Sequence, residues 1–214
     1  LNFQTDTAGS AEIPLAGYDL RDGDDGSLYH TGAQGNINYF KFRQPVLAAN
    51  TRQGRVLSWF DRNSDAAIFL YDGAGTLKES ASVRSSPAGF ADWWPAGGLR
   101  EGDRIVLECC RGRRAQLQLL PLSARASVAQ NLLLGTAPAS SVVLGEIIRR
   151  DPISGKESQY EKSSLSDASG AFSIPLDEIV HLHAGDRFRV WWQHADGDWM
   201  LVDHYAPQIT VNQT

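Results

Sequence analysis

The residues best suited to hold a metal ion form an acidic turn near the start of the chain. Asp22 and Asp24 lie in the segment Asp22-Gly23-Asp24-Asp25-Gly26, and carboxylates on a glycine-bent loop can converge on Ca²⁺. The fifth-position ligand and the distal glutamate of an EF-hand are absent, and acidic turns without metal are common. We therefore expect no resident cofactor and keep calcium at Asp22 and Asp24 as an open alternative.

Four of the five histidines gather in the last part of the chain, at His181, His183, His194 and His204. His181 and His183 would share one face of an extended strand, and histidines so placed are common zinc ligands. No spacing brings all four side chains to one point. We therefore expect separate surface or interface histidines rather than a zinc centre.

Tryptophans are the candidates for contact with a ligand or a partner. Exposed indoles stack on sugar rings or anchor protein interfaces. A neighbouring module or subunit that covers the same face is the interpretation we favour, with a sugar ligand as the alternative. The candidates are Trp93, Trp94, Trp191 and Trp199.

Strand alternation separates the two indoles of the Trp191-Trp192 pair. In residues 188–193 a period of two places Phe188, Val190 and Trp192 on one face, which we expect to be the core. Trp191 then lies on the opposite face. The adjacent Trp93 and Trp94 pose the same division between an inner and an outer side chain.

Signatures of catalysis and of nucleic-acid binding are missing from the 214 residues. The sequence holds no HExxH, P-loop or GxSxG motif. A net charge of −5 gives no basic field for nucleic acid or anionic lipid, and the longest apolar runs are too short to span a membrane. We expect a protein that is not an enzyme, binds no nucleic acid and does not insert into a membrane.

The two cysteines are neighbours, Cys109 and Cys110. Adjacent residues of a strand point to opposite faces, so an ordinary disulfide between them would distort the backbone. We expect one buried and one partly exposed thiol. A vicinal disulfide or a bridge to another subunit is the alternative.

A recurring turn pattern predicts an all-β fold of two modules in series. A glycine-aromatic step at residues 89–90 precedes Gly102-Asp103-Arg104, and a similar step at 170–172 precedes Gly185-Asp186-Arg187. Turn signals recur every 8 to 12 residues, as in β-sandwiches. We place an N-terminal sandwich with a polar leader at residues 1–125 and a C-terminal sandwich at 126–214.

Each module also resembles a family of bacterial secreted or surface β-sandwiches. Residues 36–120 resemble the pre-peptidase C-terminal type in the run 36–42, the hairpin 67–75 and the late Gly102-Asp103-Arg104 strand. Residues 141–212 resemble carboxypeptidase-regulatory or transthyretin-like Ig-type modules in the phrase 166–174. The resemblance implies a jelly-roll-like sandwich followed by an Ig-like one, both without catalytic residues.

Apolar residues alternate with polar ones at both chain ends and offer a route to assembly. Leu1 and Phe3 do so at one end, and Ile209 and Val211 at the other. Either segment could add to an exposed sheet edge of a neighbour. Pairing of both segments within their own chain is the alternative.

These features together favour a non-catalytic protein that is secreted or held at the cell surface. We expect a structural role, as a self-assembling fibre or envelope subunit or as an adhesin stalk, with copies of itself or other surface proteins as partners. The alternative is a carbohydrate-binding accessory module of an extracellular hydrolase, with a polysaccharide as partner. A peptidase-associated module is a third class, implied only by the family resemblance.

Overall fold

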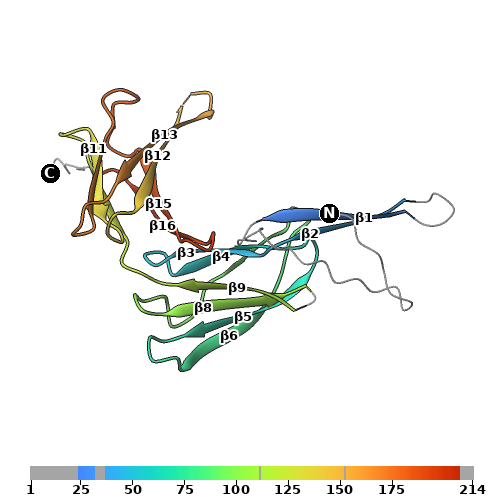
Figure 1. Ribbon diagram of the computed structural model, residues 1–214. Coiled ribbons are helices and arrows are strands. Elements are labelled where there is room, and N and C mark those ends of the chain that lie inside the picture. Colours follow the sequence, from blue (N-terminus) through green and yellow to red (C-terminus); the bar gives the residue numbers. More distant parts are fainter. Residues whose placement is uncertain (1–23, 32–36, 111, 152, 208–214) are drawn as a thin grey trace.

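The computed structural model describes residues 24–31, 37–110, 112–151 and 153–207, with side chains described for residue 24 and from residue 44 onward. Every helix or strand in these ranges is a β-strand, which confirms the predicted all-β fold (Figure 1). Some residues for which the sequence makes predictions lie outside the described ranges, namely Leu1, Phe3, Asp22, Ile209 and Val211.

The first module packs a three-stranded sheet against a four-stranded one. The order of the smaller sheet is β3-β4-β7 and that of the larger is β6-β5-β8-β9. The strands are β3 (Val46–Asn50), β4 (Arg55–Trp59), β5 (Asp65–Tyr71), β6 (Leu77–Arg84), β7 (Phe90–Trp93), β8 (Arg104–Cys109) and β9 (Arg113–Gln118).

The second module repeats this arrangement strand for strand. Its smaller sheet has the order β10-β11-β14 and its larger sheet the order β13-β12-β15-β16. The strands are β10 (Ser123–Ser127), β11 (Leu132–Thr136), β12 (Val142–Arg150), β13 (Glu157–Leu165), β14 (Ala171–Pro175), β15 (Arg187–Gln193) and β16 (Trp199–Tyr205).

The two modules therefore have the same strand order. We had expected two different types, a jelly-roll-like sandwich followed by an Ig-like one. β10 pairs with β11 and β11 with β14, so the second set of strands begins at Ser123. The boundary that we predicted between the modules, after residue 125, falls inside β10. That the two modules fold independently stays a prediction.

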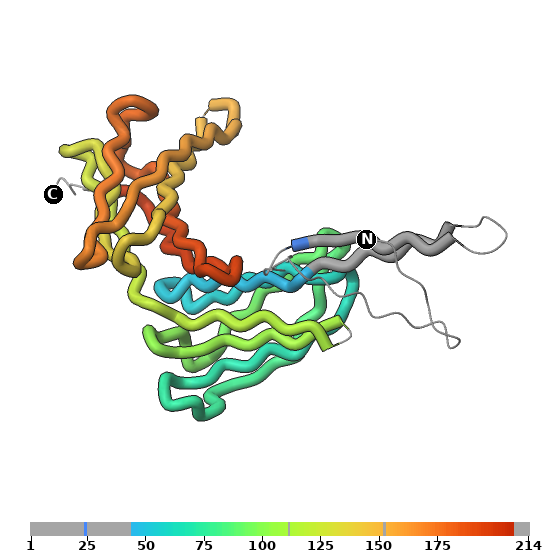
Figure 2. Tube along the Cα trace, viewed as in Figure 1, coloured from blue at the N-terminus to red at the C-terminus, as the bar shows by residue number. Residues whose placement is uncertain are grey.

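A parallel strand pair joins the two modules into a seven-stranded sheet of order β13-β12-β15-β16-β3-β4-β7. Trp199 and Met200 of β16 pair with Ala48 and Ala49 of β3. Figure 2 shows the red end of the second module returning to lie beside the blue strands of the first. A separate antiparallel hairpin, β1 (Asp25–Thr31) with β2 (Ile37–Arg43), leads into β3.

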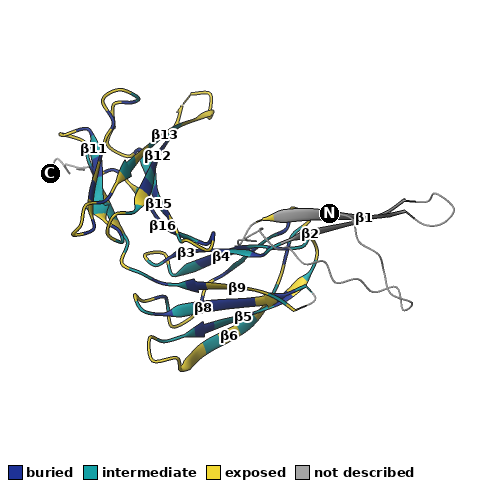
Figure 3. Ribbon diagram, in the orientation of Figure 1, coloured by how far each residue is buried: buried dark blue, intermediate teal, exposed yellow. Residues whose placement is uncertain are grey.

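Buried apolar side chains form two clusters, one in each sandwich, while the turns are exposed (Figure 3). Phe188, Val190 and Trp192 are all buried, and Trp191 is only half-buried, which confirms the predicted faces of that strand. Phe188 and Val190 belong to the second core, but Trp192 packs in the first. The strand thus contributes to both cores.

The glycine-aromatic steps mark a backbone crossing that only glycine allows. Gly89 has a φ of +82° and Gly170 a φ of +86°. A Cβ would lie 2.6 Å from the Phe60 carbonyl oxygen at the first site and 2.4 Å from that of Ala137 at the second. The carbonyl of Gly89 accepts a hydrogen bond from the Phe60 amide at 2.9 Å, and the carbonyl of Gly170 accepts one from the Ala137 amide at 2.8 Å.

The Gly-Asp-Arg turns are also built alike. Gly102 and Gly185 have φ values of +84° and +88°. The carboxylate of Asp103 accepts a hydrogen bond from the Arg100 amide, and that of Asp186 from the His183 amide, both at 2.8 Å. Each carboxylate also meets a cation at 2.6 Å, which is Lys78 for the first aspartate and Arg149 for the second.

We expect Gly170→Ala to destabilise the protein by clearly more than Gly75→Ala. Gly75 has the same φ of +86° but nothing within 4 Å of its added Cβ, so its substitution costs only the positive-φ strain of about 1–2 kcal/mol. Gly170→Ala adds a clash with backbone that must move. Urea unfolding of the two variants measures the difference, and equal losses would contradict the crossing.

We further expect Asp186 to make the protein sensitive to acid. Burial by itself raises the pKa of Asp186, but hydrogen bonds from Arg149 and the His183 amide outweigh it and hold the pKa below its ordinary 3.8. A lowered folded-state pKa contributes stability above the unfolded pKa, and this stability is lost as pH falls through the folded value.

Asp186→Asn should therefore cost about 1–3 kcal/mol at neutral pH, because it removes a charged acceptor from buried donors. The loss should shrink as pH falls below about 4. Urea unfolding of wild type and variant across that range tests both statements. A difference that is independent of pH would contradict the assignment.

Candidate functional site

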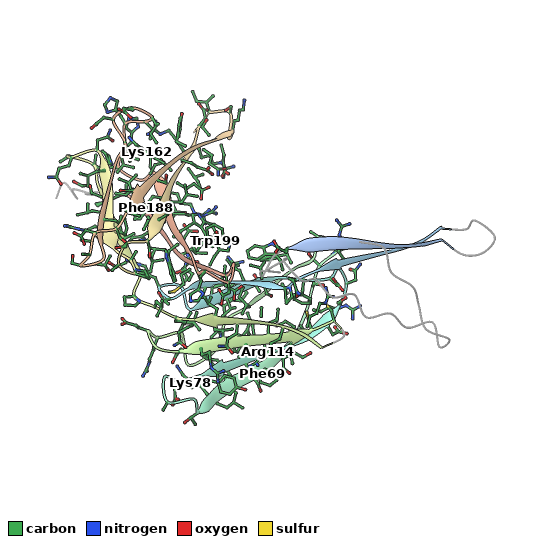
Figure 4. The ribbon with its side chains drawn as sticks, viewed as in Figure 1. Phe69, Lys78, Arg114, Lys162, Phe188 and Trp199 are labelled. Carbon is green, nitrogen blue, oxygen red and sulfur yellow. The ribbon has the colours of Figure 1, made fainter. Side chains whose placement is uncertain are left out.

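A pocket of about 570 Å³ opens on the outer face of the seven-stranded sheet, beside the seam between the modules. Residues of β3, β4, β12, β13, β15 and β16 line it. Figure 4 labels Trp199 at the angle between the two modules. The volume of the pocket falls within the roughly 300–1,000 Å³ typical of small-ligand sites.

Strand alternation determines which side chains reach this face. Because Val190 and Trp192 point into the cores, Arg189 and Trp191 point outward. Register places Leu144 beside Trp191, and Glu146 between Arg189 and Glu161. The pocket thus collects every second residue of three neighbouring strands.

Two of the predicted tryptophans meet in the pocket. The rings of Trp191 and Trp199 lie 6.1 Å apart between centroids at an interplanar angle of 87°, so they form a corner rather than a flat platform. Trp59 from the first module also lines the pocket, and its ring packs 5.4 Å from that of Phe90. Three indoles from two modules therefore share one pocket.

Glu146 is the buried polar group of the pocket, with its side chain only 5% exposed. Its Oε2 accepts a hydrogen bond from Trp191 Nε1 at 3.1 Å and lies 3.5 Å from Arg189 Nη1. Among the described residues nothing donates to its other oxygen, Oε1. A buried carboxylate with one free acceptor is suited to receive a donor from a ligand.

The neighbouring charges are paired with one another. Arg187 donates to both carboxylate oxygens of Asp203, and Arg189 Nε lies 3.2 Å from Asp203 Oδ2. The pKa of Arg187 is raised above its ordinary value, mainly because of its hydrogen bond to Asp203. With Glu146, two guanidinium groups and two carboxylates form one network, of which Arg189 and Glu146 line the pocket. Glu161 adds an exposed carboxylate at the rim.

The other two predicted tryptophans lie outside this pocket. Trp93 is buried in the first core, so it offers no exposed ring, because β7 turns that side chain inward. Trp94 is 56% exposed, and the Arg55 guanidinium carbon lies 4.8 Å from its ring centroid. Of these two tryptophans, only Trp94 exposes its indole ring to solvent.

Metal-binding side chains do not converge within the described part of the chain, where no group of three or more His, Cys, Asp or Glu residues could hold an ion. His181 and His183 are exposed at a loop, and His204 packs edge-on against Phe188. Asp24 is exposed. Calcium at Asp22 and Asp24 stays a hypothesis.

The cysteines are free thiols, one buried and one partly exposed, as predicted. Burial raises the pKa of Cys109 to about 12, with a hydrogen bond to Cys110 adding to the effect. Cys109 therefore stays protonated and unreactive near neutral pH.

Sequence reasoning missed Trp59 and Glu146. Glu146 sits in the apolar run of β12, where alternation assigns it to the outer face, but nothing marks it as a partner of Trp191. Trp59 reaches the pocket only because β16 pairs with β3, a contact between segments about 150 residues apart.

No protein-family model matches the chain, and no curated protein matches it. Solved structures similar to it include a tetra-tandem repeat in the extending region of a large adhesion protein (TM-score 0.27, 14% identity, 85% of this chain and 57% of that one). Others are the BSP domain of a biofilm-associated protein (0.29, 14%, 79% and 30%) and a pullulanase from Anoxybacillus sp. LM18-11 (0.27, 12%, 73% and 25%).

The chain spans less than two thirds of each of these proteins, and the low TM-scores support no conclusion about function. In the described ranges no helix is long and apolar enough to cross a membrane. The features of the chain that bear on its function are the sheet shared by the two modules and the pocket beside the seam.

Proposed function

We propose that this is a non-catalytic structural protein of the cell surface or exterior, in which two β-sandwiches act as one rigid segment of a stalk or envelope. The sheet that runs unbroken from one module into the other carries the proposal. Domains joined only by a linker move relative to one another by default, whereas shared strand pairing and a shared core fix their orientation.

Backbone hydrogen bonding supports a fixed junction. The Leu47 amide donates to Asp198 Oδ1 at 2.6 Å, a buried contact between residues 151 positions apart. Asp198 is itself fully buried. Breaking this contact would leave a buried carboxylate short of a donor, which is costly.

Side-chain packing supports it as well. Met200 is 0% exposed, and it lies with Trp192 in the core of the first module although both belong to strands of the second. The Leu120 amide donates to Met200 Sδ at 3.2 Å. Moving the modules apart would expose both apolar side chains to water, at roughly 1.5–3 kcal/mol for a side chain of this size.

A rigid junction predicts one narrow distance between the modules. Spin labels at Ala74→Cys and Ile153→Cys, both at exposed positions, report it by pulsed electron spin resonance in a Cys110→Ser background. Cys109 can stay, because its raised pKa makes it unreactive. We expect a single sharp distribution for the wild-type junction.

Asp198→Ala combined with Met200→Ser should broaden that distribution while both sandwiches stay folded. Tyr205→Ala is the matched control, because Tyr205 is exposed on the same strand outside the pairing with β3. A broad distribution in the unaltered junction would refute the rigid-segment role.

Self-association through the terminal segments is the second part of the proposal. Leu1 and Phe3 alternate with polar residues, as do Ile209 and Val211, and a donated strand can join copies head to tail in an open series. Light scattering should show assemblies of the full chain at high concentration, and deletion of residues 1–9 should return monomers. A monomeric full chain that the deletion leaves unchanged would contradict this part.

A further inference from the structure

We propose that the pocket at the seam binds an uncharged sugar unit of a soluble oligosaccharide or glycan chain end. This inference goes beyond the structural role and does not depend on it. It rests on the three indoles of Trp59, Trp191 and Trp199 together with the buried carboxylate of Glu146.

Indole faces favour a pyranose ring. The π face of an aromatic ring carries negative charge, and the axial C–H groups of a sugar present a weakly positive apolar face to it. Trp191 and Trp199 stand at 87°, so one indole can stack on the ring while the other flanks its edge. Trp59 extends the apolar wall from the first module.

Polar groups of the pocket match hydroxyl groups. Glu146 Oε1 is free to accept from a ligand hydroxyl, while Trp191 Nε1 holds Oε2 in place at 3.1 Å. At the rim Gln159 Nε2 donates to Glu161 Oε1 at 2.8 Å, and both side chains are exposed. These groups offer acceptors and an amide at the edge of an apolar corner, the mix that an uncharged polyhydroxy ligand requires.

Charge argues against an ionic ligand. Arg189 is the one guanidinium of the pocket lining, and it is already paired with Glu146 and with Asp203 behind the lining. An anionic ligand would have to compete with two carboxylates for this guanidinium, and the exposed Glu161 would repel a carboxylate or phosphate. A cation would meet Glu161 at the rim and the free Oε1 of Glu146, whose charge is already paired with Arg189. Titration with a cation is therefore part of the test.

The corner shape also selects the form of the saccharide. A flat array of coplanar rings suits the surface of an insoluble polysaccharide, but the perpendicular pair encloses a single ring. We therefore expect binding to soluble chains and chain ends, and none to crystalline cellulose or chitin.

The indole N–H signals of the six tryptophans provide a direct test on the wild-type protein. Cellotriose, mannotriose and triacetylchitotriose are titrated separately and followed by ¹H–¹⁵N spectra, with signals assigned from single Trp→Phe variants. We expect at least one of them to shift the signals of Trp191 and Trp199 and to leave that of Trp94 in place.

Variants then locate the site. Trp191→Ala and Glu146→Gln should each weaken binding by about tenfold or more. Trp94→Ala, which removes an exposed indole outside the pocket, should leave binding unchanged. Glu161→Gln, at an exposed rim position, keeps the test valid if either pocket variant fails to fold, and it should weaken binding by a smaller factor.

Three results would overturn the proposal. One is the absence of any shift with all three sugars at millimolar concentration. Another is equal weakening by Trp94→Ala and Trp191→Ala. The third is a larger shift of the Trp191 and Trp199 signals by tetramethylammonium than by any of the sugars at the same concentration, which would make the pocket a cation site. None of these results bears on the spin-label distances.

Discussion

The parallel pairing of β16 with β3 is the contact on which the architecture depends. It spans only Trp199–Ala48 and Met200–Ala49, yet it converts two sheets into one. The buried bond from the Leu47 amide to Asp198 and the insertion of Met200 into the neighbouring core hold it in place. The pocket exists because of this contact, since it sets Trp59 of one module beside indoles of the other.

Both sandwiches use the same structural devices at matching positions. Ser85 Oγ donates to the Asp61 carbonyl in the first module, and Ser166 Oγ donates to the Pro138 carbonyl in the second. Gly89 and Gly170 make the same crossing. These serines satisfy backbone carbonyl groups, as buried backbone requires, and these glycines permit the positive φ of the crossing.

The local structure was predictable, and the joining of distant strands was not. The alternation of residues 188–193 correctly predicted which side chains are buried, because a strand with one covered face has a period of two. The adjacent cysteines also divided into one buried and one partly exposed thiol as expected, but Cys110 lies beyond the end of β8 with a φ of +40°, so strand alternation is not the cause. No local pattern encodes the pairing of residue 199 with residue 48, since register between separate modules depends on tertiary packing. For that reason Trp191 and Trp199 were found, but their neighbour Trp59 was missed.

The repeated strand order also shows which residues would meet if a second copy docked by the contact that forms the seam. By register, the first module carries Arg113 where the second carries Met200, and β10 carries Arg125 where β3 carries Ala48. In the described part of the chain β9 and β10 are the corresponding sheet edges. A second copy docking by the same contact would place Arg113 opposite Ala126 on the inner face and Arg125 opposite Gly112 on the outer face. Charged side chains on an edge oppose such pairing. This edge chemistry therefore favours other contacts for the assembly proposed above, and the alternating residues at the chain ends are the candidates that the sequence supplies.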